Sequence, residues 1–196
     1  MTENPSFPRL VSLAAHDLRT PLATVSGFAK TLARMSELQD PADRYVQMIE
    51  AASGQLAELL DELGLAARIE AGRYSPALRE VDTRELAAAA AERLGADRVR
   101  ASGTGTPVRI DPDATKRAVS ALTRCALRHG GLDEVEVIAA GAELLIQPIT
   151  PSAAPVVLGE ELRDLGAAVA GRLVGALGGS LELDGDSLRV RLPDSP

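Results

Sequence analysis

The sequence contains very little of three things on which whole protein classes depend: cysteine, aromatic residues and excess positive charge. Cys125 is the single cysteine, so no disulfide can form within the chain, and no group of His, Cys or acidic residues has the spacing of a zinc site. Two Phe, two Tyr and no Trp offer little surface for stacking bases, and a formal net charge of −7 opposes binding to a phosphate backbone. We therefore predict no metal site, no nucleic-acid partner and a reducing compartment, the cytoplasm.

Long apolar runs are also missing. No stretch approaches the roughly 18 uninterrupted apolar residues that a membrane-spanning helix requires. The N-terminal "MTENPSFPRL" lacks the basic segment and apolar run of an export signal. The 196 residues are nevertheless 45% hydrophobic, which is enough for the core of one large domain or two small ones. We expect a protein that neither crosses a membrane nor is exported.

Two segments, residues 6–36 and 41–70, show the seven-residue apolar repeat of paired helices. The repeat positions are Val11, Ala15, Leu18, Leu22, Val25, Ala29 and Leu32 in the first segment and Val46, Ile49, Ser53, Leu56, Leu60, Leu63 and Ala67 in the second. Between them, Asp40 is placed to cap the second helix and Pro41 to occupy its first turn. Two long helices with a short connection predict an antiparallel hairpin. Because small residues in both repeats leave a lone hairpin little to bury, we predict a homodimer whose two hairpins form a four-helix bundle.

Beyond residue 75 the pattern changes to short strands alternating with helices. The expected strands are 77–81, 98–101, 108–110, 134–139, 143–147, 180–183 and 187–192, and the expected helices are 83–94, 113–128 and 159–177. The cluster of Gly103, Gly105 and Pro107 and the glycine pairs 130–131 and 178–179 are expected to supply turns. Alternation of this kind predicts a sheet covered by helices, an α/β sandwich. The predicted domains are therefore 1–75, a helical hairpin, and 76–196, the sandwich.

The segment "LAAHDLRTPLATVSGF", residues 13–28, concentrates polar groups around a helical histidine. At 100° per residue, His16 lies one position past the apolar repeat and faces solvent, with Asp17 adjacent and Arg19 and Thr20 one turn away. Pro21 has no N–H for the carbonyl of Asp17, so we expect the helix to bend just beyond the histidine. Neutral imidazole offers a lone pair for attack, and a carboxylate bonded to the other ring nitrogen would stabilise the cation that forms.

The stretch "AAHDLRTPLATVSGF" resembles the phospho-acceptor box of the bacterial sensor histidine kinases, and "YVQMIEAASGQLAELLDELGLAARIEAG" is similar to the second helix of their dimerisation domain. The resemblance covers residues 6–75. It implies that His16 accepts a phosphoryl group, that Asp17 polarises the ring, and that Thr20 orients a water for dephosphorylating a partner. The implied partner is the receiver domain of a response regulator, and we take Arg19 and Pro21 as residues that contact it.

The remaining chain resembles the family's ATP-binding domain in outline but departs from it at the nucleotide site. Where "RIDPDATKRAVSALTRCALRHGG" would carry asparagines that ligate Mg²⁺, it has Ala121 and Cys125, which are not hard oxygen ligands. The stretch "QPITPSAAP" has neither the acid nor the glycines of the adenine-binding box. In "DLGAAVAGRLVGALGGSLEL" only Gly166 matches the last glycine box, and Asp164 places a carboxylate where the triphosphate would lie. The segment for the nucleotide lid, 150–163, is also short.

The other polar residues have simpler interpretations. Cys125 is expected to be a small buried side chain, and His129, at a helix end before two glycines, is expected to meet the terminal carbonyls. Glu58, Asp61 and Glu62 are expected to form the solvated face of the second hairpin helix.

Our leading hypothesis is a histidine phosphotransferase that relays phosphoryl groups through His16 to or from receiver aspartates, with Mg²⁺ supplied by the receiver. The departures above disfavour ATP as a cofactor, and the degenerate sandwich would then serve as a docking surface. Three alternatives stay open: an ATP-dependent sensor kinase with an unusual nucleotide site, a non-enzymatic pseudokinase scaffold, and a phosphatase of the regulator that depends on Thr20.

Overall fold

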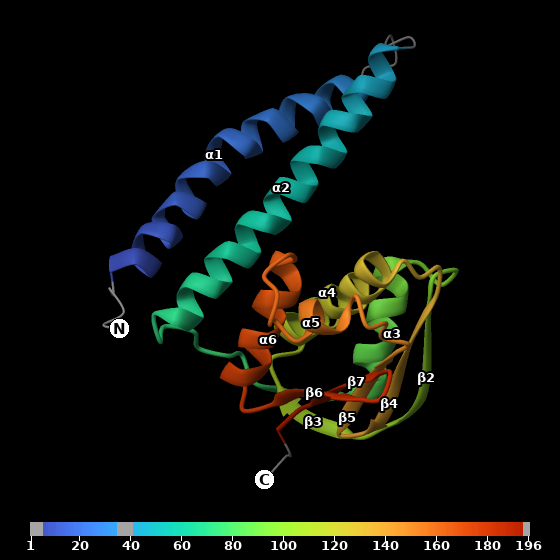
Figure 1. Cartoon of the computed structure of the whole chain (residues 1–196). Coiled ribbons are helices and arrows are strands. Elements are labelled where there is room, and N and C mark those ends of the chain that lie inside the picture. The colour runs from blue at the N-terminus through green and yellow to red at the C-terminus, as the bar shows by residue number, and fades with distance from the viewer. Residues whose placement is uncertain (1–5, 35–40, 194–196) are drawn as a thin grey trace. The chain divides into compact units, whose positions relative to one another are not determined.

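The computed structural model describes residues 6–34 and 41–193. The chain divides into two compact units, Met1–Arg73 and Tyr74–Pro196, and each is considered by itself (Figure 1). A helical unit followed by a mixed α/β unit confirms the predicted fold class.

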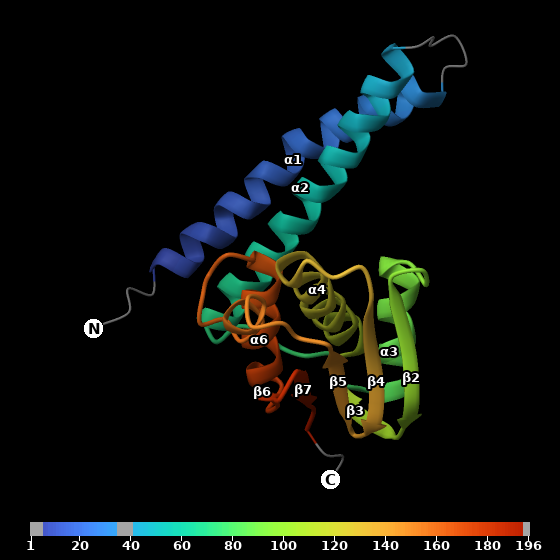
Figure 2. The same ribbon diagram turned by 45° about the vertical axis from the view of Figure 1, so that its right-hand side comes forward.

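The first unit is a hairpin of two long helices, α1 (Ser6–Arg34) and α2 (Ala42–Glu70), which pack against each other along their length (Figures 1 and 2). Helix α1 continues through Pro21, as its periodicity predicts. Pro41 takes the N-cap position of α2 and supplies no side-chain cap, so it lies just before the helix and not in its first turn. The predicted cap Asp40 and the predicted helix end at Ser36 lie outside the described residues.

The apolar repeat of each helix separates into two lines with different environments. One line is largely buried where the two helices meet, and its residues are Ala15, Leu22 and Ala29 on α1 with Val46, Ser53, Leu60 and Ala67 on α2. The other line is between 41% and 54% exposed in the single chain at Leu18, Val25, Leu32, Ile49 and Leu56, while Val11 and Leu63, which belong to the same line, are partly covered. A hairpin of two helices therefore fully covers only one of the two lines of its apolar repeat.

The second unit is built on a five-stranded sheet with the order β2-β4-β5-β7-β6. These strands are β2 (Val99–Gly105), β4 (Val135–Gly141), β5 (Glu143–Gln147), β7 (Ser187–Arg191) and β6 (Ser180–Asp184), and β2 and β4 are parallel while the other neighbours are antiparallel. Two further strands, β1 (Arg79–Asp82) and β3 (Pro107–Ile110), form a separate antiparallel pair. The helices are α3 (Thr83–Leu94), α4 (Pro112–Gly130), α5 (Ala154–Val157) and α6 (Leu165–Ala176).

The helices of this unit cover one face of the five-stranded sheet (Figures 1 and 2). Alternate strand residues point toward them and are buried, among them Val135, Val137, Leu144, Ile146, Leu188 and Val190. Helix α4 is the centre of this core, because most of its residues from Ala114 to Leu127 are buried and it packs against both α3 and α6. The period-two burial of the strands thus fixes which face the helices cover.

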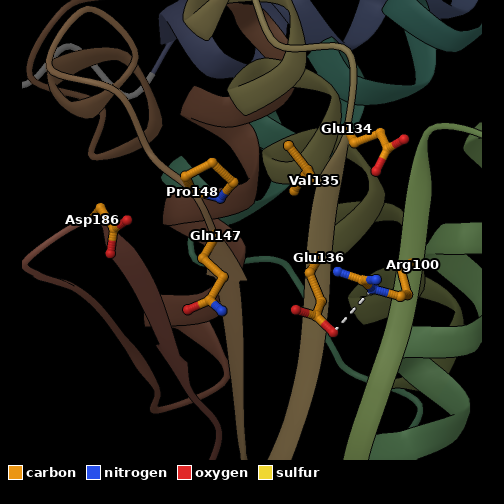
Figure 3. A pocket seen from close by; sticks show the side chains of 7 residues that line it. All are labelled: Arg100, Glu134, Val135, Glu136, Gln147, Pro148 and Asp186. Atoms are coloured by element: carbon orange, nitrogen blue, oxygen red, sulfur yellow. Dashed lines mark ion pairs between the residues drawn. The ribbon is translucent and has the colours of Figure 1, made fainter.

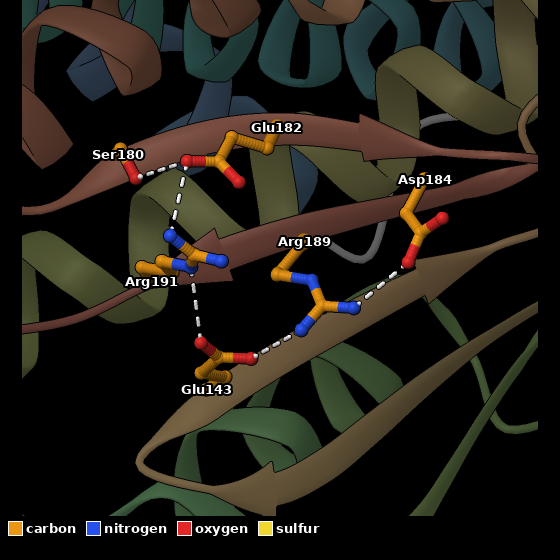
Figure 4. A network of polar contacts seen from close by, with 6 residues as sticks. All are labelled: Glu143, Ser180, Glu182, Asp184, Arg189 and Arg191. Carbon is orange, nitrogen blue, oxygen red and sulfur yellow. Dashed lines mark hydrogen bonds and ion pairs between the residues drawn. The ribbon is translucent and has the colours of Figure 1, made fainter.

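The opposite face of the sheet carries charged side chains that neutralise one another across strands β5, β6 and β7 (Figure 4). Glu143 accepts hydrogen bonds from Nη1 of Arg189 at 3.0 Å and from Nε of Arg191 at 3.1 Å. Arg189 also donates to Asp184, and Arg191 donates to Glu182. Paired charges of this kind keep an uncovered sheet face soluble while adding little stability.

The end of β2 and the start of α6 differ most from the predicted boundaries. Strand β2 runs to Gly105, so the glycines expected to form a turn lie within the strand; at Gly103 the φ angle is +84° and a Cβ would overlap the carbonyl oxygen of Ala139 on β4. The helix expected at 159–177 begins only at Leu165, because Asp164 is its N-cap and its carboxylate accepts a hydrogen bond from the backbone N–H of Ala167 at 3.0 Å.

Asp111 anchors the beginning of the second unit to helix α4. One carboxylate oxygen caps α4 by accepting from the N–H of Ala114 at 3.1 Å, and the other accepts from the hydroxyl of Tyr74 at 3.0 Å and the N–H of Ala77 at 3.1 Å. Burial alone would raise the pKa of this carboxyl, but the three hydrogen bonds together with the nearby charge of Arg117 lower it below its ordinary value.

We predict that Asp111→Asn lowers the free energy of unfolding at neutral pH by about 1–2 kcal/mol, since an amide keeps the cap but loses acceptors for two donors. The pKa of Asp111 is lower in the folded chain than in the unfolded chain. The carboxylate therefore makes its full contribution to the free energy of unfolding above about pH 4, and this contribution is lost as pH falls through the pKa of the folded state. Denaturation of both proteins between neutral pH and about pH 3 should show the difference shrinking. The control is Asp113→Asn, an exposed acid in the same helical turn; equal pH profiles for the two variants would contradict the role of Asp111.

Candidate functional site

Helix α1 presents His16 to solvent with Asp17 against its ring. The imidazole side chain is 76% exposed, and its Nδ1 lies 3.2 Å from Oδ1 of Asp17, within hydrogen-bond distance. With its proton on Nδ1 and directed at the carboxylate, the ring carries a lone pair on Nε2. An exposed neutral imidazole oriented by an acid is a nucleophile for a group delivered from outside.

The neighbours of His16 on α1 are exposed as well. Thr20, one turn along, keeps its side chain in solvent, while its carbonyl accepts a hydrogen bond from the hydroxyl of Thr24 at 3.1 Å. Pro21 is exposed and lies inside the helix. These residues form a polar surface around the histidine, on which Thr20 and Pro21 are accessible to a partner.

Arg19 forms an ion pair with Asp61 of α2 that the sequence alone did not predict. Its guanidinium donates from Nη2 to Oδ1 of Asp61 at 2.6 Å and from Nε at 3.2 Å, which joins α1 to α2 three residues from His16. Asp61 is exposed, as expected for the solvated face of α2, and it is in addition paired with Arg19. The sequence offered no signal for the pair, because the two residues are 42 positions apart.

The positions matched to the family's nucleotide site lie on α4 and at the start of α6. Ala121 and Cys125 are buried, and Gly166 is buried in the first turn of α6. Burial, and secondarily the charge of Asp164, raises the pKa of the Cys125 thiol to about 12, so that the group is a neutral thiol at physiological pH. A buried neutral thiol and an alanine provide no oxygen for Mg²⁺, and the donor set does not fit a magnesium nucleotide.

His129, expected only to meet helix-terminal carbonyls, instead faces Asp164. Its Nε2 lies 3.5 Å from Oδ2 of that acid, and the side chains of both residues are largely buried. Cys125 lies one turn before His129 on the same face of α4, so three potential metal ligands from two helices come together. The sequence alone did not predict this cluster, because strands β4 and β5 and helix α5 separate Asp164 from the other two residues along the chain.

A pocket of about 360 Å³ lies elsewhere, on the face of the sheet that the helices leave uncovered (Figure 3). Its lining includes Glu134, Glu136 and Asp186 and a single basic residue, Arg100, whose Nε is 3.3 Å from a carboxylate oxygen of Glu136. Excess negative charge with its one cation already paired repels a polyphosphate. The charge of this pocket therefore disfavours a nucleotide. Within the described part of the chain, no helix is long and apolar enough to cross a membrane.

Comparisons with known proteins agree with this geometry. Residues 9–72 match the model of the His Kinase A phospho-acceptor domain. The histidine protein kinase DivJ of Caulobacter vibrioides is 29% identical over 171 residues, which cover 81% of this chain and 28% of DivJ. The chain thus spans little more than a quarter of the length of that relative.

Solved structures show the same fold. Full-length ShkA in complex with AMPPNP aligns over 96% of this chain and 47% of its own, with a TM-score of 0.67 and 19% identity. The ATP-binding domain of PrrB from Mycobacterium tuberculosis aligns over 61% of this chain and 99% of its own, with a TM-score of 0.50 and 24% identity.

We predict that the Arg19–Asp61 pair contributes modestly to stability. Both side chains are about half exposed, so a double-mutant cycle with Arg19→Ala and Asp61→Ala should give a coupling energy of about 0.5 kcal/mol, measured by chemical denaturation in low salt. The same cycle with Arg44, which belongs to α2 but not to this pair, should give zero coupling to Asp61. A coupling above about 2 kcal/mol would contradict an exposed, solvent-screened pair.

Proposed function

Because the chain belongs to the two-component sensor histidine kinase family, we propose that it is a histidine phosphotransferase that relays phosphoryl groups through His16 to or from receiver aspartates of response regulators. The observation that carries the proposal is the contrast between the two units. His16 is exposed and oriented by Asp17, whereas Ala121, Cys125 and Asp164 stand where nucleotide-binding groups would be needed. A chain that can accept a phosphoryl group on His16 but lacks residues suited to binding ATP is consistent with transfer of the phosphoryl group between proteins.

The chemistry follows from the ring nitrogens of His16. Nε2 attacks the phosphorus of a receiver's aspartyl phosphate, the P–N bond forms, and the P–O bond to the receiver carboxylate breaks. The ring becomes a cation, and the carboxylate of Asp17 at Nδ1 stabilises that charge. The reverse attack by a receiver aspartate regenerates neutral imidazole. Mg²⁺ held by the receiver would neutralise charge on the phosphoryl oxygens, so this chain needs no metal for the step.

The remaining residues at this surface have positioning roles in the proposal. Thr20 and Pro21, exposed beside His16, would contact the receiver, and Thr20 would orient a water if the phosphoryl group is hydrolysed. Arg19, fixed by Asp61, would present its remaining guanidinium donors to the partner. We assign residues 76–196 to docking, since they keep a folded core without a usable nucleotide site. Transfer requires both proteins in one compartment, for which we propose the cytoplasm.

We predict that a phosphorylated receiver transfers label to the intact chain, and that His16→Ala abolishes the transfer while Asp17→Asn slows it by about 100-fold. Thr31→Ala, an exposed change on the same helix, should leave the rate unchanged. A parallel reaction with labelled ATP and Mg²⁺ should give no phosphohistidine. Label from ATP would instead establish a kinase, and label from neither donor, with the receivers of the same organism tested, would favour a scaffold.

We also propose that two copies of the chain pair through their hairpins. Support comes from the exposed apolar line of Leu18, Val25, Leu32, Ile49 and Leu56, whose seven-residue spacing matches what a four-helix bundle buries. On α1 this line lies about 160° from His16 at 100° per residue, so pairing leaves the histidine accessible.

We predict that Leu56→Glu weakens the dimer by roughly 100-fold, because symmetry places two uncompensated carboxylates in the apolar interface. Sedimentation at several concentrations measures the change. Gln55→Glu adds the same charge at the adjacent exposed position and should leave the dimer intact. A monomeric parent chain, or equal effects of the two variants, would exclude this interface.

A further inference from the structure

The cluster of Cys125, His129 and Asp164 has the composition and placement of a metal centre. Cys125 and His129 are four residues apart on α4, a spacing that stacks two side chains on one face of a helix. Asp164 comes from the N-cap of α6, which packs against α4. The sulfur, one ring nitrogen and one carboxylate oxygen all lie within 4.8 Å of one another.

His129 gives a second, independent observation. Its Nε2 is shielded from solvent and makes no hydrogen bond within the described residues. The 3.5 Å contact with Oδ2 of Asp164 is longer than an ordinary hydrogen bond. Buried polar atoms are nearly always satisfied, and an unpaired one needs a partner that the chain itself does not supply. Here the nitrogen and the thiol of Cys125 converge on the same carboxylate.

Asp164 can serve a metal without giving up its structural role. Oδ1 accepts the hydrogen bond from the N–H of Ala167 that caps α6, while Oδ2 is the oxygen nearest His129. A carboxylate that is held by one oxygen presents the other in a fixed direction, as ligands supported by a hydrogen bond do in metal sites. The cap therefore preorganises the third ligand.

We propose that Cys125, His129 and Asp164 bind one Zn²⁺ ion, with a water molecule as the fourth ligand. The donor set of one thiolate, one imidazole and one carboxylate suits zinc and excludes Mg²⁺, which requires oxygen ligands in an octahedron. Zinc bonds of about 2.0–2.3 Å place tetrahedral ligand atoms roughly 3.5 Å apart. The His129–Asp164 contact already has that separation. The sulfur of Cys125 lies within 4.8 Å of the other two ligand atoms, so side-chain rotations that move it by about 1 Å bring it to the same separation.

Binding exchanges one bond for another without a redox step. The S–H bond of Cys125 is lost, its proton passes to solvent, and the sulfur lone pair forms the bond to zinc. The ion then joins the last turns of α4 to the first turn of α6. This inference does not depend on phosphotransfer through His16, which lies in the other unit.

The test uses the intact chain, freed of metal by a chelator and titrated with Zn²⁺ by calorimetry. To remove adventitious binding at the exposed His16 and Asp17, every protein carries His16→Gln. We expect one tight zinc site per chain, with affinity reduced by about 100-fold or more in Cys125→Ser and in Asp164→Asn. Asparagine caps helices as well as aspartate does, so Asp164→Asn keeps α6 capped while removing the anionic ligand.

Cobalt gives a second readout that does not depend on affinity. Because Cys125 is the single cysteine, a thiolate-to-cobalt charge-transfer band in the near ultraviolet can come only from this site. The band and the strong visible absorption of tetrahedral Co²⁺ should appear with the His16→Gln chain and vanish with Cys125→Ser. As a control for folding, the metal-free chains with and without Cys125→Ser should give the same melting curve. Absence of the band, or zinc binding that survives in Cys125→Ser, would overturn the proposal.

Discussion

Everything in the first unit depends on one packing constraint: two helices side by side share a single line of contact. Each helix carries an apolar repeat wide enough for two lines, and the hairpin buries only the one formed by small residues such as Ala15, Ala29 and Ser53. Small residues bring the two helices close but bury little area, so apolar burial within one hairpin is limited. The exposed second line is what a further pair of helices would cover. That arrangement also determines where chemistry can occur, because His16 lies on the side of α1 that neither line occupies.

The pattern of burial explains which features were predictable from sequence. Seven-residue periodicity predicted both long helices, and the strand alternation predicted the sheet, because these signals are local. The polar motif around His16 predicted an exposed histidine with an acidic neighbour, and the structure has both. By contrast, the ion pair of Arg19 with Asp61 and the contact of His129 with Asp164 join residues that are distant in sequence. No local pattern specifies such pairs, since the partner is chosen by tertiary packing.

The boundary errors have local physical causes. Gly103 was taken as a turn signal, yet its missing side chain serves a close approach between strands β2 and β4. The helix predicted from residue 159 starts at 165, because Asp164 ends the preceding loop and caps the helix with its carboxylate. An aspartate immediately before an apolar helical run is an N-cap signal, so this boundary was present in the sequence and was overlooked.

Asp164 connects the departures from the family's nucleotide-binding motifs to the proposed zinc site. A carboxylate at this place opposes a triphosphate by its charge. The same carboxylate caps α6 with one oxygen and faces His129 with the other. Burial raises the pKa of the nearby Cys125 thiol, and the charge of Asp164 adds to that increase. A divalent cation reverses that unfavourable pairing, because it stabilises both the carboxylate and a thiolate. Cys125 likewise removes a hard ligand for Mg²⁺ and supplies a soft one. Two of the residues that disfavour a magnesium nucleotide, Cys125 and Asp164, are therefore also two of the three proposed zinc ligands.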